Sequence, residues 1–127
     1  MSRADRQTAR PVSDHLLAVA RRVRVRSEKD EERLGDDFMA RLGYDVIRLS
    51  QARASRQSLG VPDRKYFNPA RGVAVWWEAK RAGGKQRPEQ AWFQRTAEAC
   101  GEVYVCGTFE ALRRVVHRLH GLPEPRV

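Results

Sequence analysis

The sequence predicts a single α/β domain with the element order α, β, β, β, α, β, α, preceded by a basic segment. Two runs rich in β-branched and aromatic residues, 63–68 and 73–80, indicate neighbouring strands. Asn68, Pro69 and Gly72 supply turn chemistry between them, so a hairpin is expected. Helical spacing of apolar residues on both sides of this hairpin adds the helices. A chain of 127 residues is long enough to bury one core.

Charge is the most informative feature of the composition. The chain has 25 Lys and Arg against 16 Asp and Glu, a net charge of +9, and a pI near 10.5. This balance points to a polyanion partner, with nucleic acid as the leading candidate, although a ribosome or an anionic membrane surface fits the charge equally well. No apolar run approaches the roughly 20 residues that span a bilayer, and the first residues lack a secretory signal. We therefore expect a cytoplasmic protein with no membrane segment.

Residues 1–27 form a basic arm. They contain seven arginines and two aspartates, a net charge of +5. After the N-cap residues Ser13 and Asp14 a short amphipathic helix is expected. Its apolar face would consist of Leu16, Leu17, Val19, Ala20 and Val23. Such an arm suits contact with DNA or with a second copy of the chain, and a solvated, frayed arm fits the same residues.

Ser27 is expected to cap the first helix of the domain, which ends at Gly43. Its buried stripe is predicted to consist of Leu34, Phe38 and Leu42. Glu31 falls on this stripe, whereas Glu32 points away from it. A buried acid needs a partner, so Glu31 is a candidate acid of a functional site. The alternative is an acid in the first turn that faces water and favours the helix dipole.

The hairpin brings two carboxylates together. If its turn is centred between Ala70 and Arg71, Asp63 lies opposite Glu78. Like charges that face each other across two strands are destabilising, so this pair needs compensation. A divalent cation shared by both carboxylates is the most economical compensation. The hairpin therefore predicts a metal site.

Strand periodicity decides which side chains share a face with Glu78. Residues two apart point to the same face, so Trp76, Glu78 and Lys80 lie together. The opposite face is predicted to carry Val73, Val75, Trp77 and Ala79. The Lys80 ammonium is thereby placed beside the metal, an arrangement that suggests a metal-dependent nuclease.

Two basic loops flank the hairpin. The first, 50–60, follows a predicted strand at 44–49, and the second follows Lys80. Their basic residues are Arg53 and Arg56 in the first loop, and Arg81, Lys85 and Arg87 in the second. These side chains suit contacts to the phosphate oxygens of DNA. For the first loop, a merely solvated segment fits as well.

A second helix is predicted to begin with Pro88 in its first turn and to close at Gly101. One of its faces carries Gln90, Phe93, Gln94 and Ala97. Gln90 lies where this helix returns to the hairpin, so its amide either orients a water or a phosphate or is a plain structural group.

A short strand at 102–106 and a last helix capped by Thr108 complete the domain. The buried face of this helix is predicted to consist of Leu112, Val115, Val116 and Leu119. Cys100 and Cys106 are expected to be free, buried thiols in a reducing compartment, because no second pair completes a zinc site. His117 and His120 could bind a metal, but two cations that favour the helix C-terminal dipole are the simpler interpretation.

The combined motifs resemble a known nuclease family. They are Glu31 in the first helix, GVPD at 60–63, GVAVWWEAK at 72–80, RPEQ at 87–90 and GEVYVC at 101–106. This set is similar to the PD-(D/E)XK nuclease superfamily and, within it, to the VRR-NUC (virus-type replication-repair nuclease) domain. The resemblance covers about residues 28–118. It implies a restriction-endonuclease-like mixed sheet flanked by helices, with an αβββαβ core in residues 28–121 and a tail at 122–127.

The resemblance also implies a set of residue roles. Asp63, Glu78 and the backbone carbonyl of Ala79 would bind Mg²⁺ or Mn²⁺, and Lys80 would help to activate the attacking water. Glu31 would complete the acidic cluster, and Gln90 matches the glutamine of the family's helix.

The substrate implied by this resemblance is branched DNA. Small stand-alone members of the family look like homodimeric endonucleases that cut four-way junctions, many of them from phages or prophages, which implies a bacterial cytoplasm. The longer loop before Gly60 and the arginine-rich arm leave substrate choice open. A nuclease for flaps or nicked DNA, and a non-catalytic nucleic-acid-binding module on the same fold, are the alternatives.

Overall fold

The computed structural model describes residues 25–49 and 59–126 and has the predicted order of elements. These are α2 (Glu28–Arg41), β1 (Asp45–Arg48), β2 (Arg64–Asn68), β3 (Val73–Ala79), α4 (Pro88–Ala99), β4 (Val103–Gly107) and α5 (Phe109–Leu119). The prediction of an α/β fold is confirmed. The basic arm up to residue 24, and with it the expected amphipathic helix, lies outside the described residues, as do Arg53 and Arg56. No helix in the described ranges is long and apolar enough to cross a membrane.

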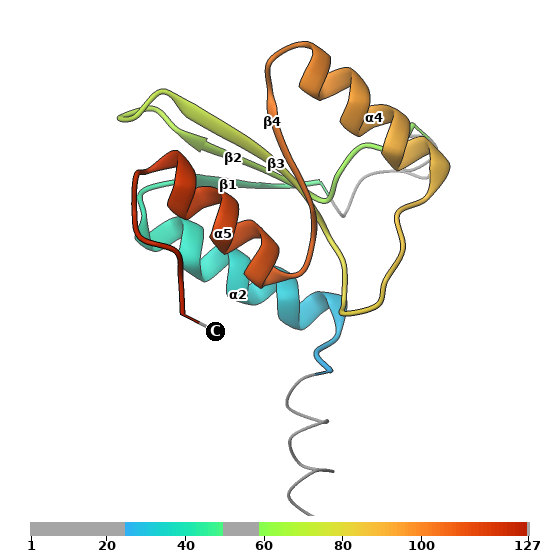
Figure 1. Ribbon diagram of the computed structural model, residues 1–127, viewed down its shortest axis with the longest axis horizontal. Coiled ribbons are helices and arrows are strands. Elements are labelled where there is room, and N and C mark those ends of the chain that lie inside the picture. The colour runs from blue at the N-terminus through green and yellow to red at the C-terminus, as the bar shows by residue number, and fades with distance from the viewer. Residues whose placement is uncertain (1–24, 50–58, 127) are drawn as a thin grey trace, which may run out of the picture.

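The four strands form one mixed sheet in the order β1-β2-β3-β4. β1, β2 and β3 are antiparallel neighbours, whereas β3 and β4 are parallel. A parallel pair needs a crossover connection, which α4 supplies. Helices α2 and α5 cover one face of the sheet, and α4 lies on the other (Figure 1). The sheet is therefore the middle layer of three.

The hairpin has the predicted register. Arg64 pairs with Trp77 and Lys65 with Trp76, so the next pair outward places Asp63 opposite Glu78. Asp63 itself lies just before the first residue of β2, and its carbonyl accepts a hydrogen bond of 2.7 Å from the Leu49 backbone N–H. The backbone of Asp63 is thus bonded to the end of β1 and lies opposite Glu78 of β3, although Asp63 is not itself a residue of β2.

The main core lies between the sheet and the α2/α5 layer. Its fully buried apolar residues are Met39, Tyr66, Val75, Trp77, Ala79, Leu112 and Val116. Val75, Trp77 and Ala79 alternate along β3 and confirm which face of that strand was predicted to be apolar. At Leu119 the prediction was wrong, because that residue ends α5 and is exposed.

The predicted buried stripe of α2 needs correction. Leu34 is 37% exposed, whereas Met39 is fully buried, and Phe38 and Leu42 are half-buried. The reason lies at Gly35, where an added Cβ would overlap the Trp77 ring. Because this glycine lets the indole pack directly against the helix, α2 is rolled so that residues 31, 35 and 39 face inward.

A second difference concerns Glu32, which was expected to point away from the sheet. Its carboxylate is 3.2 Å from Nη1 of Arg64, a buried residue of β2. Asp36 accepts further hydrogen bonds from Arg64 Nε at 2.9 Å and from Tyr66 Oη at 2.8 Å. Strand alternation turns the Arg64 guanidinium toward α2, and a buried cation requires acids around it.

The α4 side of the sheet has a smaller aromatic cluster. Phe93 of α4 packs edge-on against Trp76 at 5.0 Å between ring centroids and lies 6.2 Å from Tyr104 of β4. Gln90 and Ala97 of the same helix are buried, which confirms the predicted inward face. This packing fixes α4 against the outer face of β3 and β4, with its first turn near the end of β3.

Candidate active site

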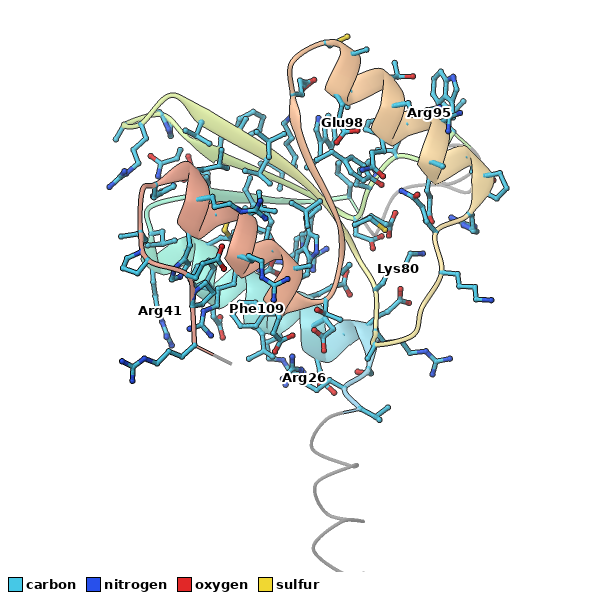
Figure 2. All side chains as sticks on the ribbon, in the orientation of Figure 1. Arg26, Arg41, Lys80, Arg95, Glu98 and Phe109 are labelled. Carbon is cyan, nitrogen blue, oxygen red and sulfur yellow. The ribbon has the colours of Figure 1, made fainter. Side chains whose placement is uncertain are left out.

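A solvent-open pocket lies where β3 ends and α4 begins. Its lining residues are Glu28, Val61, Asp63, Glu78, Lys80, Arg87 and Gln90. They come from the start of α2, the segment before β2, the end of β3 and the start of α4. Four of the five residues predicted to act in catalysis therefore meet in one place: Asp63, Glu78, Lys80 and Gln90. Lys80 is labelled in Figure 2, between the end of β3 and the loop that leads to α4.

Asp63 and Glu78 form a close carboxyl pair. Burial raises the pKa of Glu78 to about 9, and both a hydrogen bond from its carboxyl group to Asp63 and the charge of Asp63 raise it in the same direction. The nearby Lys80 charge opposes this shift. Without a cation, Glu78 therefore keeps its proton at neutral pH. Because two adjacent carboxylates need either a shared proton or a cation, this pair fits a divalent metal.

Gln90 holds one member of this pair in place. Its Nε2 donates a hydrogen bond of 2.9 Å to Oε1 of Glu78, and its Oε1 accepts one of 2.9 Å from the backbone N–H of Arg87. The amide is thus oriented by the first turn of α4. These contacts fit the structural role expected for Gln90, and they add a partner that the sequence did not predict, the Glu78 carboxyl group.

Lys80 continues the strand pairing one residue beyond β3. Its backbone N–H donates a hydrogen bond of 2.9 Å to the carbonyl of Gly107, which anchors the residue while its side chain lines the pocket. The side chain of Ala79 is fully buried in the core, so only its backbone could serve as a ligand.

Glu31 is not part of this pocket. Its carboxylate is buried and accepts a hydrogen bond of 2.8 Å from the backbone N–H of Phe109, at the start of α5. Arg26 binds the same carboxylate through Nε at 2.7 Å and bridges to Glu110 at 2.6 Å. Figure 2 shows Arg26 and Phe109 at the starts of α2 and α5. Glu31 is buried, as its place on the stripe predicts, but the prediction that it completes the acidic cluster is corrected, because its partners are Arg26 and the start of α5.

Glu28 lies where an acid of the first helix was expected. It lines the pocket, and its charge contributes to the raised pKa of Glu78. Glu28 was not predicted from the sequence, because projection onto an apolar stripe cannot find an exposed acid. The available signal was its position directly after the N-cap Ser27, at the start of α2.

The basic loop residues fall into two groups. Arg87 lines the pocket, whereas Arg81 and Lys85 are exposed on the loop before it. Gln86 ties this loop to α4, since its Nε2 donates a hydrogen bond of 2.8 Å to Oε1 of Gln94. Because Gln86 fixes the end of this loop against α4, Arg87 is held in the pocket that contains the carboxyl pair.

The remaining candidate ligands do not gather into a second centre. His120 lies 2.6 Å from the Tyr44 hydroxyl, and His117 lies 2.6 Å from the carbonyl of Pro123. Both cysteines are free, but the prediction that both are buried was wrong, because Cys100 is exposed at the end of α4. Burial raises the pKa of Cys106. Within residues 25–49 and 59–126, no group of three or more His, Cys, Asp or Glu side chains is arranged to hold a metal. The Asp63–Glu78 pair thus remains the strongest candidate, with oxygen donors that suit Mg²⁺ or Mn²⁺.

Gly60 sets the approach of the chain to this pair. It has a φ of +75°, and an added Cβ would overlap the backbone carbonyl of Glu89 in the first turn of α4. Only glycine combines this left-handed conformation with so close a contact. The segment before Asp63 is thereby fixed against the helix that carries Gln90.

We predict that Gly60→Ala lowers stability by about 1–3 kcal/mol, because the substitution adds backbone strain and a steric clash. Urea unfolding measures this loss. Gly72→Ala is the matched control, since Gly72 also has a positive φ, of +65°, but an added Cβ would meet no atom within 4 Å. Equal losses in the two variants would show that conformation alone matters at residue 60 and would contradict the packing account.

Comparison with protein-family models, with curated proteins and with solved structures finds no match to this chain.

Proposed function

We propose that this protein is a Mg²⁺- or Mn²⁺-dependent DNA endonuclease that hydrolyses phosphodiester bonds on a restriction-endonuclease-like core. One observation carries the proposal. A buried carboxyl with a strongly raised pKa, Glu78, hydrogen-bonds to Asp63 in an open pocket that also contains Lys80. Carboxylates with perturbed pKa values that meet a lysine in a pocket mark a functional site. The motifs at Gly60–Asp63 and Glu78–Lys80, similar to those of the VRR-NUC domain, support the same conclusion.

The side chains take separate roles in this proposal. Asp63, Glu78 and the carbonyl of Ala79 would hold the cation, which would supply Lewis-acid stabilisation of the phosphate charge when bound. Lys80 orients the attacking water and donates a hydrogen bond to it or to the scissile phosphate. Gln90 keeps the Glu78 carboxylate in position through its 2.9 Å hydrogen bond.

The basic residues bind the DNA backbone in this proposal. Those of the pocket rim and its loop are Arg87, Arg81 and Lys85, to which Arg53 and Arg56 are added from the sequence. Phosphate contacts of this kind give affinity without sequence preference. Branched DNA is the proposed substrate, on the strength of the family resemblance. A four-way junction has two-fold symmetry and needs two cuts, so a homodimer is proposed as the active form.

A non-catalytic DNA-binding module is the second candidate, and the carboxyl pair disfavours it. Two acids next to a phosphate site repel the polyanion unless a cation is bound between them. A binding module gains nothing from Asp63 and Glu78 at this place. A nuclease for flaps or nicked DNA would use the same residues and differs only in substrate.

Cleavage of a panel of labelled DNAs tests the function. The panel is a four-way junction, a matched linear duplex, a flap and a nicked duplex, each with Mg²⁺, with Mn²⁺ and with EDTA. We expect symmetric cuts in the junction that require the metal, and sedimentation should show a dimer. Tight junction binding without cleavage in either metal would support the binding module instead.

A further inference from the structure

Trp92 is an exposed aromatic residue of α4, the helix whose first turn lines the candidate active site. It is 51% exposed, whereas Trp77 is fully buried and Trp76 is half-buried. Within the described ranges its indole N–H has no hydrogen-bond acceptor. Tryptophan is highly buried on average, so half of an indole left in water is unusual and points to a partner.

The position of Trp92 is fixed by α4. Gln90, two residues earlier, points to Glu78, and two residues turn a helix by about 200°. Trp92 therefore lies on the opposite side of the first turns of α4 from the carboxyl pair. The helix between them is roughly 10 Å across, including its side chains. A DNA strand whose phosphate lies at the pocket can reach Trp92 within a few nucleotides.

Exposed basic residues lie before and after Trp92 along α4, and an exposed leucine precedes the segment that packs on the first turn of this helix. Arg87, at the N-cap of α4, and Arg95, one turn after Trp92, are exposed (Figure 2 labels Arg95). Leu59 is 60% exposed and precedes Gly60, which packs on Glu89 of the same first turn. Glu89 is the nearby acid, and it lies 3.4 Å from Arg87 Nε. Basic side chains around an aromatic face suit a nucleotide, with its phosphate on the arginines and its base on the ring.

We propose that Trp92 stacks on an unstacked nucleobase of the DNA close to the scissile phosphate. This inference rests on the proposed function and names the substrate feature that the enzyme recognises. In a continuous duplex the face of every base is covered by its neighbours. A branch point, a gap or a single strand exposes a base, so a stacking residue at this distance from the carboxyl pair selects interrupted DNA.

Two substitutions test the proposal through cleavage. Base stacking on an aromatic side chain contributes enough that Trp92→Ala should lower kcat/KM on a four-way junction about tenfold or more. The ratio of junction to duplex cleavage should fall with it, and Trp92→Phe should keep most of the ratio. The matched control is Phe67→Ala, which removes another exposed aromatic residue (43% exposed) from β2, outside the pocket lining. A junction preference that survives in Trp92→Ala would overturn the proposal.

Fluorescence in EDTA separates this proposal from the proposed function, because it needs no cleavage. Trp92 is the most exposed of the three tryptophans and should be the one quenched by acrylamide. A junction should protect it from acrylamide, and a matched duplex should not. Equal quenching with and without the junction would overturn the stacking proposal even if the wild type cuts DNA. Protection by the junction without cleavage of any DNA would refute the nuclease and leave the stacking proposal standing.

Discussion

Glu31→Ala should lower the free energy of unfolding by about 1–3 kcal/mol, the cost of leaving a hydrogen-bond donor without its buried acceptor. The substitution leaves the Arg26 guanidinium without its 2.7 Å partner. It also leaves the backbone N–H of Phe109 unpaired at the start of α5, where Thr108 makes no side-chain capping bond. Urea unfolding measures the loss. Glu31→Gln, which keeps a hydrogen-bond acceptor, should lose less and retain kcat.

Glu28→Ala is the matched control, because it removes an acid from the same turn of α2. Glu28 is exposed and lines the pocket, so its loss should leave stability within about 1 kcal/mol, the value of one acid near a helix N-terminus. The cleavage rate of the Glu28→Ala variant should fall instead, and the Mg²⁺ concentration that it needs for half-maximal cleavage should shift. If Glu31→Ala retained full stability and lost cleavage, the assignment of the two acids would be reversed.

Glu78→Gln should abolish cleavage and at the same time stabilise the metal-free protein at high pH. The amide keeps an oxygen to accept the hydrogen bond from Gln90 but removes one negative ligand. Cleavage should fall at least about 10³-fold, the order lost when a group that stabilises transition-state charge is removed. Loss of activity in a more stable protein would separate a catalytic role from a structural one.

The pH dependence of this gain follows from the pKa of Glu78, which rises from 4.5 to about 9 on folding. The folded state binds the Glu78 proton more tightly than the unfolded state does. The contribution of this proton to stability is therefore complete below pH 4.5 and is lost as pH rises toward 9. Glu78→Gln has no such proton to lose. In EDTA, the melting temperature of the variant minus that of wild type should therefore increase from pH 5 to pH 9. A constant difference would contradict the shared-proton description of the Asp63–Glu78 pair.

The hairpin and its carboxyl pair could be predicted from sequence because local chemistry determines them. Asn68, Pro69 and Gly72 set the turn, and the turn sets the register that places Asp63 opposite Glu78. The same applies to α4, where Pro88 fixes the start and so directs Gln90 toward the end of β3. These features depend on residues that are close together in the chain.

The roll of α2 could not be predicted in this way, because it depends on a contact across the core. Leu34 and Phe38 fit an apolar stripe, but Gly35 admits the Trp77 ring, so that Met39 is buried and Leu34 is exposed. A pattern among residues that are close in the sequence does not predict a contact between Gly35 of α2 and Trp77 of β3. Arg64 was missed for a related reason, since a charged residue is expected outside and its acidic partners lie 28 and 32 positions earlier.

The most direct measurement of the central claim is cleavage of a labelled four-way junction by wild type and by Glu78→Gln, side by side, in Mg²⁺ and in EDTA. Wild type should cut the junction in Mg²⁺ alone, and the variant should not cut it even though it is folded and binds the junction. Cleavage by Glu78→Gln at the wild-type rate, or cleavage by wild type in EDTA, would contradict the assignment of this pocket as a metal-dependent nuclease site.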